Sequence, residues 1–284
     1  MLRIGLRAHD YGTLPPEQLA DKIAAYNAES IQLALSKALV PAPVPGSLSP
    51  GYARCIRKIF ERRDISIAVL GCYINPIHPD TNEREKSLRY FEEHLRFARD
   101  FDCALVGTET GSINADCSFH PDTGKEKTFD VFCASIERLL NCAEKCGSIV
   151  AIEPVAYQHT ISSIEKMDRL LRLFPTPALR VIWDPVNLLP VEGLNESQES
   201  FFTRALDTWG DKIAAVHIKD FVMEGGCKKG DLLAGTGELD WPVLLKLIQE
   251  RKAGVDILLE NTRPETAHST ITFIRETADK AVSK

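Results

Sequence analysis

The sequence predicts an α/β protein in which residues 1–284 form a single (β/α)8-barrel domain. Short apolar or β-branched segments alternate with longer amphipathic segments along the whole chain, and eight such pairs are present. A strand that is always followed by a helix implies a parallel sheet with right-handed crossovers, which stays open or closes into a barrel. Eight units favour closure, and the chain length is close to the roughly 250 residues that are typical of such barrels.

The predicted strands are short runs rich in Ile, Val and Leu, as expected for the buried strands of a parallel sheet. In chain order they are Leu2–Arg7, Ser30–Leu35, Ser66–Cys72, Cys103–Thr108, Ile149–Glu153, Leu179–Asp184, Ile213–Lys219 and Val255–Glu260. The predicted helices carry apolar residues at helical spacing, which gives each a face that packs on the barrel. They are Pro15–Ala28, Gly51–Arg63, Asn82–Phe101, Lys127–Cys146, Ser162–Phe174, Ser197–Trp209, Trp241–Arg251 and Pro264–Val282.

The connections between these elements also favour one barrel. The alternative is an open, doubly wound sheet, but no predicted strand is followed by the G-x-G-x-x-G turn of a dinucleotide-binding sheet. The proline-rich segment Val40–Pro50 falls between the second strand and the second helix. We therefore interpret it as a long βα loop and not as a linker between domains.

The composition is typical of a soluble protein in a reducing compartment. A formal net charge of -6 and a pI near 5.7 give no pull towards nucleic acid, and the basic run Arg54–Arg63 has the spacing of a solvated helix face. The eight cysteines are scattered through apolar segments, so we expect no disulfides and interpret Cys142 and Cys146 as small core residues. The sequence shows neither a signal peptide nor an apolar run of the roughly 18 residues that a membrane helix requires. We expect a cytoplasmic protein without membrane or nucleic-acid partners.

Four consecutive predicted strands each supply one side chain that can ligate a metal. The sequences are IEP with Glu153, WDP with Asp184, HIKD with His217 and LLEN with Glu260. The carboxyl ends of barrel strands converge on one mouth, where these barrels build their active sites. Three carboxylates and one imidazole suit Mn²⁺ or Mg²⁺, and Co²⁺ or Zn²⁺ would also fit. Any one of the acids could instead cap a helix or pair with a base, but four in succession favour a metal site.

In this order, the motifs resemble those of the sugar phosphate isomerase and epimerase family, the xylose isomerase-like TIM barrels. The resemblance spans essentially the whole chain and includes GCYINPIHPD at Gly71–Asp80, GTETGS at Gly107–Ser112 and GTGELDW at Gly235–Trp241. It implies that the four strand-end residues bind one divalent ion, Mn²⁺ by preference, and that Glu153 and Glu260 are acid/base groups on opposite sides of the substrate. It also implies a small sugar or sugar phosphate as substrate and a homodimer or homotetramer.

The chemistry expected of such a site is proton transfer next to a carbonyl. A cation that bridges a ketose carbonyl and the adjacent hydroxyl stabilises the enediolate by several kcal/mol. One carboxylate removes the proton, and its return to the opposite face by the other gives an epimer. Transfer on one face between neighbouring carbons gives an aldose–ketose isomerisation. We therefore predict a metal-dependent isomerase or epimerase.

Other polar residues near the strand ends are candidates for substrate binding. Lys219 shares the face of His217 by strand alternation, so it reaches the substrate or pairs with a neighbouring acid, whereas Asp220 orients the following loop. The remaining candidates are His9, Asn75, His78, Glu109 and Asn187.

Phosphate binding would use the loops after the seventh and eighth strands. The candidates there are Arg263 and a segment that contains Lys228, Lys229, Gly230 and Gly235–Gly237. For that segment we favour the simpler interpretation, a flexible lid with ordinary turn glycines before a helix that begins at Asp240.

The sequence departs from the ketose 3-epimerases that it resembles. Those enzymes have a second Glu six residues after the strand-five ligand and a His three residues after the strand-six Asp, where this chain has His159 and Asn187. The specificity of a 3-epimerase is therefore not carried over. Isomerase, epimerase and sugar dehydratase activities stay open.

Two further hypotheses come from other classes of protein. An endonuclease IV-like DNA-repair enzyme shares the barrel, but its three-metal site needs a His three residues after the strand-six Asp and an Asp-x-His beyond strand seven. Here the second stretch reads Asp231-Leu232-Leu233. A catalytically inactive, metal-dependent sugar-binding protein is the other hypothesis, and it would not need both Glu153 and Glu260 as opposed acid/base groups.

Overall fold

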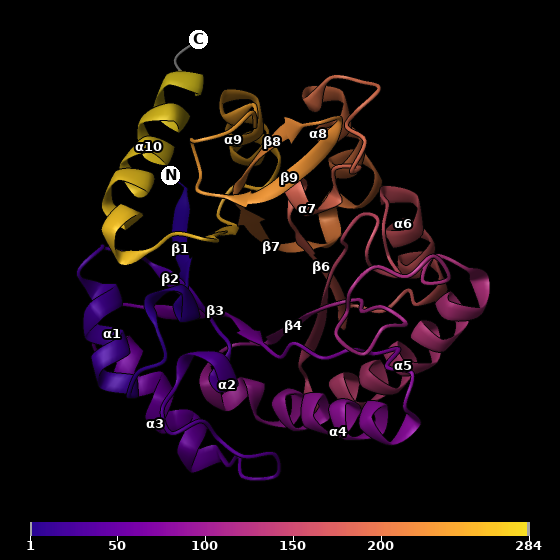
Figure 1. Ribbon diagram of the computed structural model, residues 1–284. Helices are drawn as coiled ribbons and strands as arrows, with labels where there is room; N and C mark the ends of the chain where they lie inside the picture. The colour runs from indigo at the N-terminus through magenta and orange to yellow at the C-terminus, as the bar shows by residue number, and fades with distance from the viewer. Residues whose placement is uncertain (1, 283–284) are drawn as a thin grey trace.

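In the computed structural model, which describes residues 2–282, parallel strands form a closed ring with helices around it (Figure 1). Around the ring the order is β1-β10-β7-β6-β5-β4-β3-β2, and each neighbouring pair is parallel. The barrel strands are β1 (Arg3–Arg7), β2 (Ser30–Leu33), β3 (Ser66–Gly71), β4 (Leu105–Glu109), β5 (Ile149–Glu153), β6 (Leu179–Trp183), β7 (Ile213–Ile218) and β10 (Asp256–Leu259). The predicted (β/α)8-barrel fold is confirmed.

Several outer helices begin after residues whose side chains satisfy free backbone N–H groups. Ser49, Asp80 and Asp240 accept such bonds through their side chains at the starts of α3, α4 and α9. The principal helices are α1 (Pro16–Ala24), α3 (Pro50–Glu61), α4 (Thr81–Phe97), α5 (Glu126–Cys146), α6 (Ile164–Leu173), α8 (Gln198–Trp209), α9 (Trp241–Arg251) and α10 (Pro264–Val282). Two short helices, α2 (Leu35–Ala38) and α7 (Pro185–Leu188), follow β2 and β6, and 3-10 turns occupy Ala8–Tyr11, Ala98–Phe101 and Gly210–Lys212.

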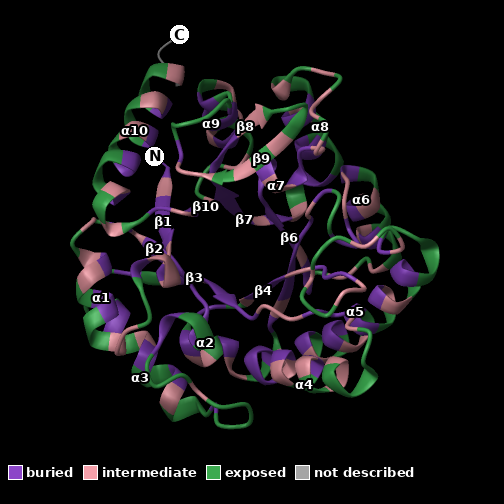
Figure 2. Cartoon of the chain, viewed as in Figure 1, coloured by how far each residue is buried: buried purple, intermediate pink, exposed green. Residues whose placement is uncertain are grey.

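The core has two parts, one between strands and helices and one inside the ring. Figure 2 shows that the barrel strands are largely buried. The inner part is small and combines side chains of different strands, namely Val69, Ala151, Ile182, Ala215 and Leu258. Gly107 of β4 is required there, because a Cβ would lie 2.6 Å from Ile182 and 2.9 Å from Val69. Apolar residues therefore fill the barrel below its mouth, and the strand ends are left for polar side chains.

A two-stranded antiparallel sheet follows β7 and was not predicted. It consists of β8 (Asp220–Glu224) and β9 (Cys227–Leu232), and it lies between α8 and α9 in the upper part of Figure 1. The overlooked signal is the Gly225–Gly226 turn, where both residues have positive φ, as a tight hairpin requires. Lys228, Lys229 and Gly230 of the segment that we interpret as a lid therefore lie in a paired hairpin, and the flexibility of that segment stays a prediction.

Several boundaries differ from the predicted ones. The second strand ends at Leu33 because Leu35 begins α2, the first helix ends at Ala24, and Asp184 follows β6 as the N-terminal cap of α7. Residues 40–49 lie in the connection before α3, as expected, and Pro50 begins that helix. The cysteines are free, and Cys142 packs against the core only in part. Among residues 2–282, no helix has the length and apolarity needed to cross a bilayer.

Candidate metal and substrate site

Three of the four predicted metal ligands meet at the mouth of the barrel. Glu153 ends β5, His217 lies in β7, and Glu260 follows β10. Parallel pairing of Leu258 with His217 places β10 beside β7, and all three side chains are buried. Their potential ligand atoms lie within 4.8 Å of one another.

The environment of His217 fits a divalent cation. Its Nδ1 atom lies 3.1 Å from Glu153 Oε2 and 3.2 Å from Glu260 Oε1. Neither contact has the geometry of a hydrogen bond, and both imidazole nitrogens lack such a partner among residues 2–282. Burial opposes protonation, but the two carboxylates raise the pKa of His217 to about 10. A buried imidazole between two carboxylates is a donor set that a metal ion satisfies.

Asp184, the fourth predicted ligand, lies outside the group of three but close to it. The side chain is fully buried. One oxygen, Oδ1, accepts a hydrogen bond from Asn187 N at 2.9 Å, and Oδ2 has no hydrogen-bond partner among the described residues. Burial raises the pKa of this carboxyl to about 6. Lys219 connects Asp184 to the triad of Glu153, His217 and Glu260. Its Nζ atom lies 3.4 Å from Asp184 Oδ2 and 3.0 Å from Glu260 Oε2.

The predicted pairing of Lys219 with a neighbouring acid is confirmed by these contacts. A third partner is Asp231 of the hairpin, whose Oδ1 atom lies 2.9 Å from Lys219 Nζ. Although burial opposes the charge, Asp184 and Glu260 raise the pKa of Lys219 above its ordinary value. The ammonium group is therefore held among three carboxylates.

Arg7, which was not predicted, contacts Glu260 from the other side. Leu6 pairs with Leu259 in the closing β1–β10 ladder, so Arg7 and Glu260 follow side by side. Arg7 Nη1 lies 3.1 Å from Glu260 Oε1, and Nη2 donates to Asn261 Oδ1 at 2.7 Å. Burial opposes ionisation of Glu260, but the surrounding cations, Lys219 foremost, hold its pKa well below the usual range. Arg7 ends its strand as Glu153 does, so a survey of strand ends that included bases would have found it.

Asn187 is joined to the site through Glu153. Its Nδ2 atom donates a hydrogen bond to Glu153 Oε1 at 2.7 Å. Its backbone N–H is the group that Asp184 caps. Asn187 therefore fixes the orientation of one candidate ligand while its own position is fixed by another.

Glu109 and His159 form a second acid and imidazole pair next to the triad. Glu109 pairs in register with Glu153 across the β4–β5 ladder, and its Oε2 atom lies 3.6 Å from His159 Nε2. Burial and the charge of Glu153 raise the pKa of Glu109 to about 7. Burial lowers the pKa of His159 to about 4, and its Nδ1 atom has no partner among residues 2–282.

The β1–β3 side of the mouth is lined by His9 and residues that were not predicted. His9 and Tyr73 pack edge to face with ring centroids 6.0 Å apart, and the amide of Gln32 donates a hydrogen bond to the Tyr73 hydroxyl. Lys37 Nζ lies 3.9 Å from the centroid of the Tyr73 ring. His9 Nδ1 and Gln32 Oε1 lack hydrogen-bond partners among the described residues. These two buried atoms therefore leave hydrogen-bonding capacity unused beside the mouth.

Two predicted substrate contacts, Asn75 and His78, form hydrogen bonds within the described chain. Asn75 donates through Nδ2 to Ser112 O at 2.8 Å and accepts a hydrogen bond from Ile77 N, so its amide ties the loops after β3 and β4 together. His78 accepts a hydrogen bond from Asp80 N next to the start of α4. Arg263 is exposed before α10 and lines a hollow of about 550 Å³ with Asp10 and Asp231, so its contact with substrate stays a prediction.

The contacts also argue against phosphate binding after β7. Lys228 Nζ donates to the carbonyls of Val186 and Leu189, both at 2.6 Å, and burial lowers its pKa to about 8. The amides of Gly235 and Gly237 donate to the buried carboxylate of Asp220. The loop-orienting role predicted for Asp220 is confirmed, and these amides are not free for an anion.

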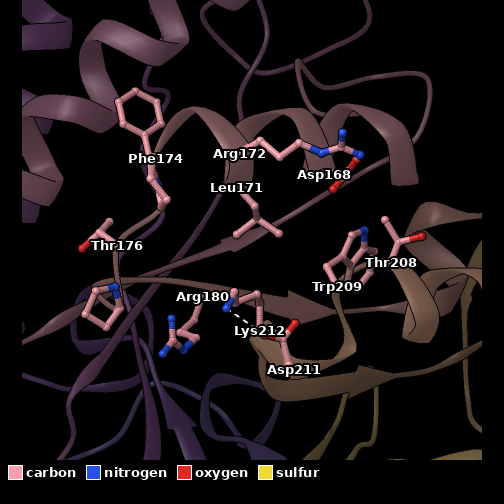
Figure 3. A pocket seen from close by; sticks show the side chains of 12 residues that line it. Asp168, Leu171, Arg172, Phe174, Thr176, Arg180, Thr208, Trp209, Asp211 and Lys212 are labelled. Atoms are coloured by element: carbon pink, nitrogen blue, oxygen red, sulfur yellow. Dashed lines mark hydrogen bonds and ion pairs between the residues drawn. The ribbon is translucent and has the colours of Figure 1, made fainter.

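A hollow of about 490 Å³ lies at the opposite end of the barrel, between the end of α6 and the end of α8 (Figure 3). Four of its charged residues pair, Arg172 with Asp168 and Lys212 with Asp211, and Arg180 donates a hydrogen bond to Leu179 O. The amino-terminal ends of the strands lie at this end, whereas the active sites of such barrels lie at the carboxyl-terminal ends. The site is therefore assigned to the mouth with Glu153, His217 and Glu260.

The fold and this mouth define a (β/α)8 barrel with a buried glutamate–histidine–glutamate centre. Residues 20–277 match the model of the xylose isomerase-like TIM barrel family, and the chain belongs to that family. No curated protein has a sequence that matches the chain significantly.

Solved structures show the same fold at low sequence identity. A D-tagatose 3-epimerase-like protein has a TM-score of 0.77 at 15% identity, with 99% of each chain covered. The 3-keto-D-glucoside 4-epimerase YcjR from E. coli has a TM-score of 0.71 at 14% identity, with 97% of this chain and 100% of that chain covered. The IOLI protein, solved with a bound zinc atom, has a TM-score of 0.72 at 16% identity, with 99% and 98% covered.

Proposed function

We propose that the protein is a divalent-metal-dependent isomerase or epimerase of a small sugar or sugar phosphate. The observation that carries the proposal is the buried His217 imidazole, which lies between two carboxylates without a hydrogen-bond partner among residues 2–282. The family to which the chain belongs, and the epimerases among the structures that resemble it, support the same class of reaction. A dimer or tetramer and a cytoplasmic location stay predictions of the sequence.

Glu153, His217 and Glu260 would hold the metal ion, and Asp184 would complete the set once Lys219 yields its contact with Asp184 Oδ2. Mn²⁺ suits three carboxylates with one imidazole, and a neighbour that binds zinc makes Zn²⁺ the main alternative. When bound, the ion supplies Lewis acidity that polarises the substrate carbonyl.

The side chains of this protein would carry the proton. One carboxylate takes the proton from the carbon next to the carbonyl, and the electron pair of the broken C–H bond moves towards the carbonyl oxygen. We assign this step to Glu153, because Arg7 and Lys219 hold Glu260 in place. Among residues 2–282, the hydrogen bonds and ion pairs of the Glu153 side chain are with the Asn187 amide and the shared His217 imidazole. Return of a proton to the opposite face would invert the carbon, and Glu260 would do this once it has taken up a proton against the pull of Arg7 and Lys219.

The test combines metal analysis with deuterium exchange. Protein loaded with Mn²⁺ is incubated in D₂O with a panel of ketoses and ketose phosphates, and ¹H NMR measures deuterium at the carbon next to the carbonyl. Glu153→Gln should abolish exchange with little change in fold, and Glu250→Gln on the exposed face of α9 is the control that should retain it.

Each outcome has a distinct meaning. Bound metal with exchange that Glu153→Gln abolishes supports the proposal and identifies the substrate class. Bound metal without exchange on any sugar contradicts it and favours a dehydratase or a binding protein. A protein that binds none of Mn²⁺, Mg²⁺, Co²⁺ and Zn²⁺ would refute the metal site itself.

A further inference from the structure

Two exposed aromatic rings stack on loops at the mouth end of the barrel. Phe119 lies in the loop after β4 and Tyr157 in the loop after β5. Their ring centroids are 4.0 Å apart and the planes are inclined by 3°. The residues remain 43% and 54% exposed, although large apolar side chains of this chain are mostly buried. A flat aromatic pair that stays open to water has surface left for a ligand.

The two loops are tied to each other beside the candidate site. Gln158 Nε2 donates to Cys117 O at 2.6 Å, and Thr160 N donates to Gly111 O at 3.1 Å. His159 lies between Gln158 and Thr160 in the chain, is 3% exposed, and faces Glu109. The aromatic pair is thus connected to the Glu109–His159 pair through adjacent residues of two bonded loops.

Backbone strain at Tyr157 is a second, independent observation. Its φ of 66° lies in the left-handed region, which a bulky aromatic side chain rarely adopts. Cys117, the residue that Gln158 binds, has a φ of 60°. Strained residues persist where the surrounding contacts hold them, and they gather at ligand sites. Here the strained turn directs an apolar ring outward, where it gains no core contacts.

We propose that Phe119 and Tyr157 form an outer subsite for a second sugar ring, so that the substrate is a glycosylated ketose and not a free monosaccharide. The inference rests on the proposed function of the inner site. The C–H groups of a pyranose carry partial positive charge and pack against the negative faces of aromatic rings. The hydroxyls at its edge require hydrogen-bonding groups, and Glu109 at the end of β4, with a side chain 37% exposed, is a carboxylate that contacts His159 of the β5 loop.

The test compares a free ketose with the same ketose carrying glucose. D-fructose is measured against its 3-O-, 4-O- and 6-O-glucosyl derivatives, turanose, maltulose and isomaltulose, with the Mn²⁺-loaded full chain. Deuterium incorporation gives kcat/KM, and calorimetry gives Kd. Phe119→Ala removes one ring, and Tyr157→Gly removes the other while accepting the positive φ. Tyr157→Phe keeps the ring, and Leu173→Ala, an exposed apolar residue at the end of α6, is the surface control.

We expect at least one glucosylated ketose to be preferred over D-fructose by about tenfold, the effect of one good aromatic contact. Phe119→Ala and Tyr157→Gly should remove that preference, and Tyr157→Phe and Leu173→Ala should retain it. A wild-type protein without the preference, or variants that keep it, would overturn the subsite while leaving the isomerase proposal intact. A change in oligomeric mass without a change in preference would also overturn it and assign the rings to a contact between copies.

Failure of the proposed isomerase function can be distinguished from failure of the aromatic subsite. If no sugar exchanges deuterium, the isomerase proposal fails and the Kd values alone decide the subsite. Tighter binding of a glucosylated ketose that depends on both rings would support the subsite, and binding that is equal in wild type and Phe119→Ala would overturn it.

Discussion

The buried carboxylate of Asp220 should be essential to the shape of the mouth, and we predict that Asp220→Asn strongly destabilises the protein. Asp220 is fully buried and accepts five hydrogen bonds. The donors to Oδ2 are Gly235 N, Gly237 N and Trp241 Nε1, at 3.0, 2.9 and 2.9 Å, and the donors to Oδ1 are Phe221 N and Leu239 N, at 2.9 and 3.0 Å.

The expected loss of stability depends on how many of the five hydrogen bonds an asparagine side chain can still accept. Asn has nearly the shape of Asp, but its NH₂ group cannot accept, so at least two donors lose their acceptor in either orientation of the side chain. A hydrogen bond to a charged group contributes about 1.5–3 kcal/mol, so we expect a loss of about 3–6 kcal/mol in the free energy of unfolding. This is a large part of the 5–15 kcal/mol, roughly, that stabilises a typical domain.

Urea unfolding followed by tryptophan fluorescence and far-UV circular dichroism measures the loss. The matched control is Asp240→Asn in the same loop, because Asp240 is exposed and accepts one capping bond, from Val243 N at 3.2 Å. Asn caps helices about as well as Asp, so the control should change stability by no more than about 0.5 kcal/mol. If Asp220→Asn lies within about 1 kcal/mol of the wild type, the carboxylate does not organise the loop as inferred.

Three further predictions concern the same face of the barrel. Lys228→Met should release the β8–β9 hairpin from the carbonyls of Val186 and Leu189, lower the free energy of unfolding by about 2 kcal/mol and speed limited proteolysis within residues 220–232. The control, Lys229→Met, removes only the exposed pair with Glu224 and should have neither effect. Equal cleavage rates in the two variants would contradict the anchoring role of Lys228. Gly237→Ala should cost about 2 kcal/mol or more in urea unfolding, because a Cβ would lie 2.1 Å from Phe221 O, and an unchanged midpoint would mean that the loop relaxes freely. Burial lowers the pKa of His159 to about 4. Between pH 6.5 and 4 the unfolded chain therefore binds more protons than the folded protein, and the free energy of unfolding decreases as the pH is lowered. From pH 7 to pH 4.5, wild type should therefore lose about 2 kcal/mol more than His159→Gln, and parallel pH profiles would exclude this role of His159.

The sequence was sufficient for the barrel and for the kinds of side chain at its mouth. Alternation of strand and helix is a local property, because apolar periodicity is set by neighbours within a few residues. The same strand ends identified Glu153, His217 and Glu260, because parallel strands bring their carboxyl ends together whatever the details of packing. The Gly225–Gly226 hairpin was equally local and could have been predicted from its turn.

Side-chain pairing across the mouth was decided by the tertiary structure. Arg7 meets Glu260 only because the first and last barrel strands pair to close the ring, and no local pattern states which base will face which acid. Likewise, His159 is brought to Glu109 by the register of β4 and β5 together with the bonds between their loops.

For Asp184, the sequence determined one feature and the tertiary structure decided another. The sequence placed a carboxylate at the right strand end, but whether it faces a metal ion or an ammonium group depends on the position of Lys219, which reaches both Asp184 and Glu260. Periodicity within a strand fixes the face on which a residue lies. The partner that it meets there is fixed by register, closure and the competition of buried charges, which depend on residues far apart in the chain.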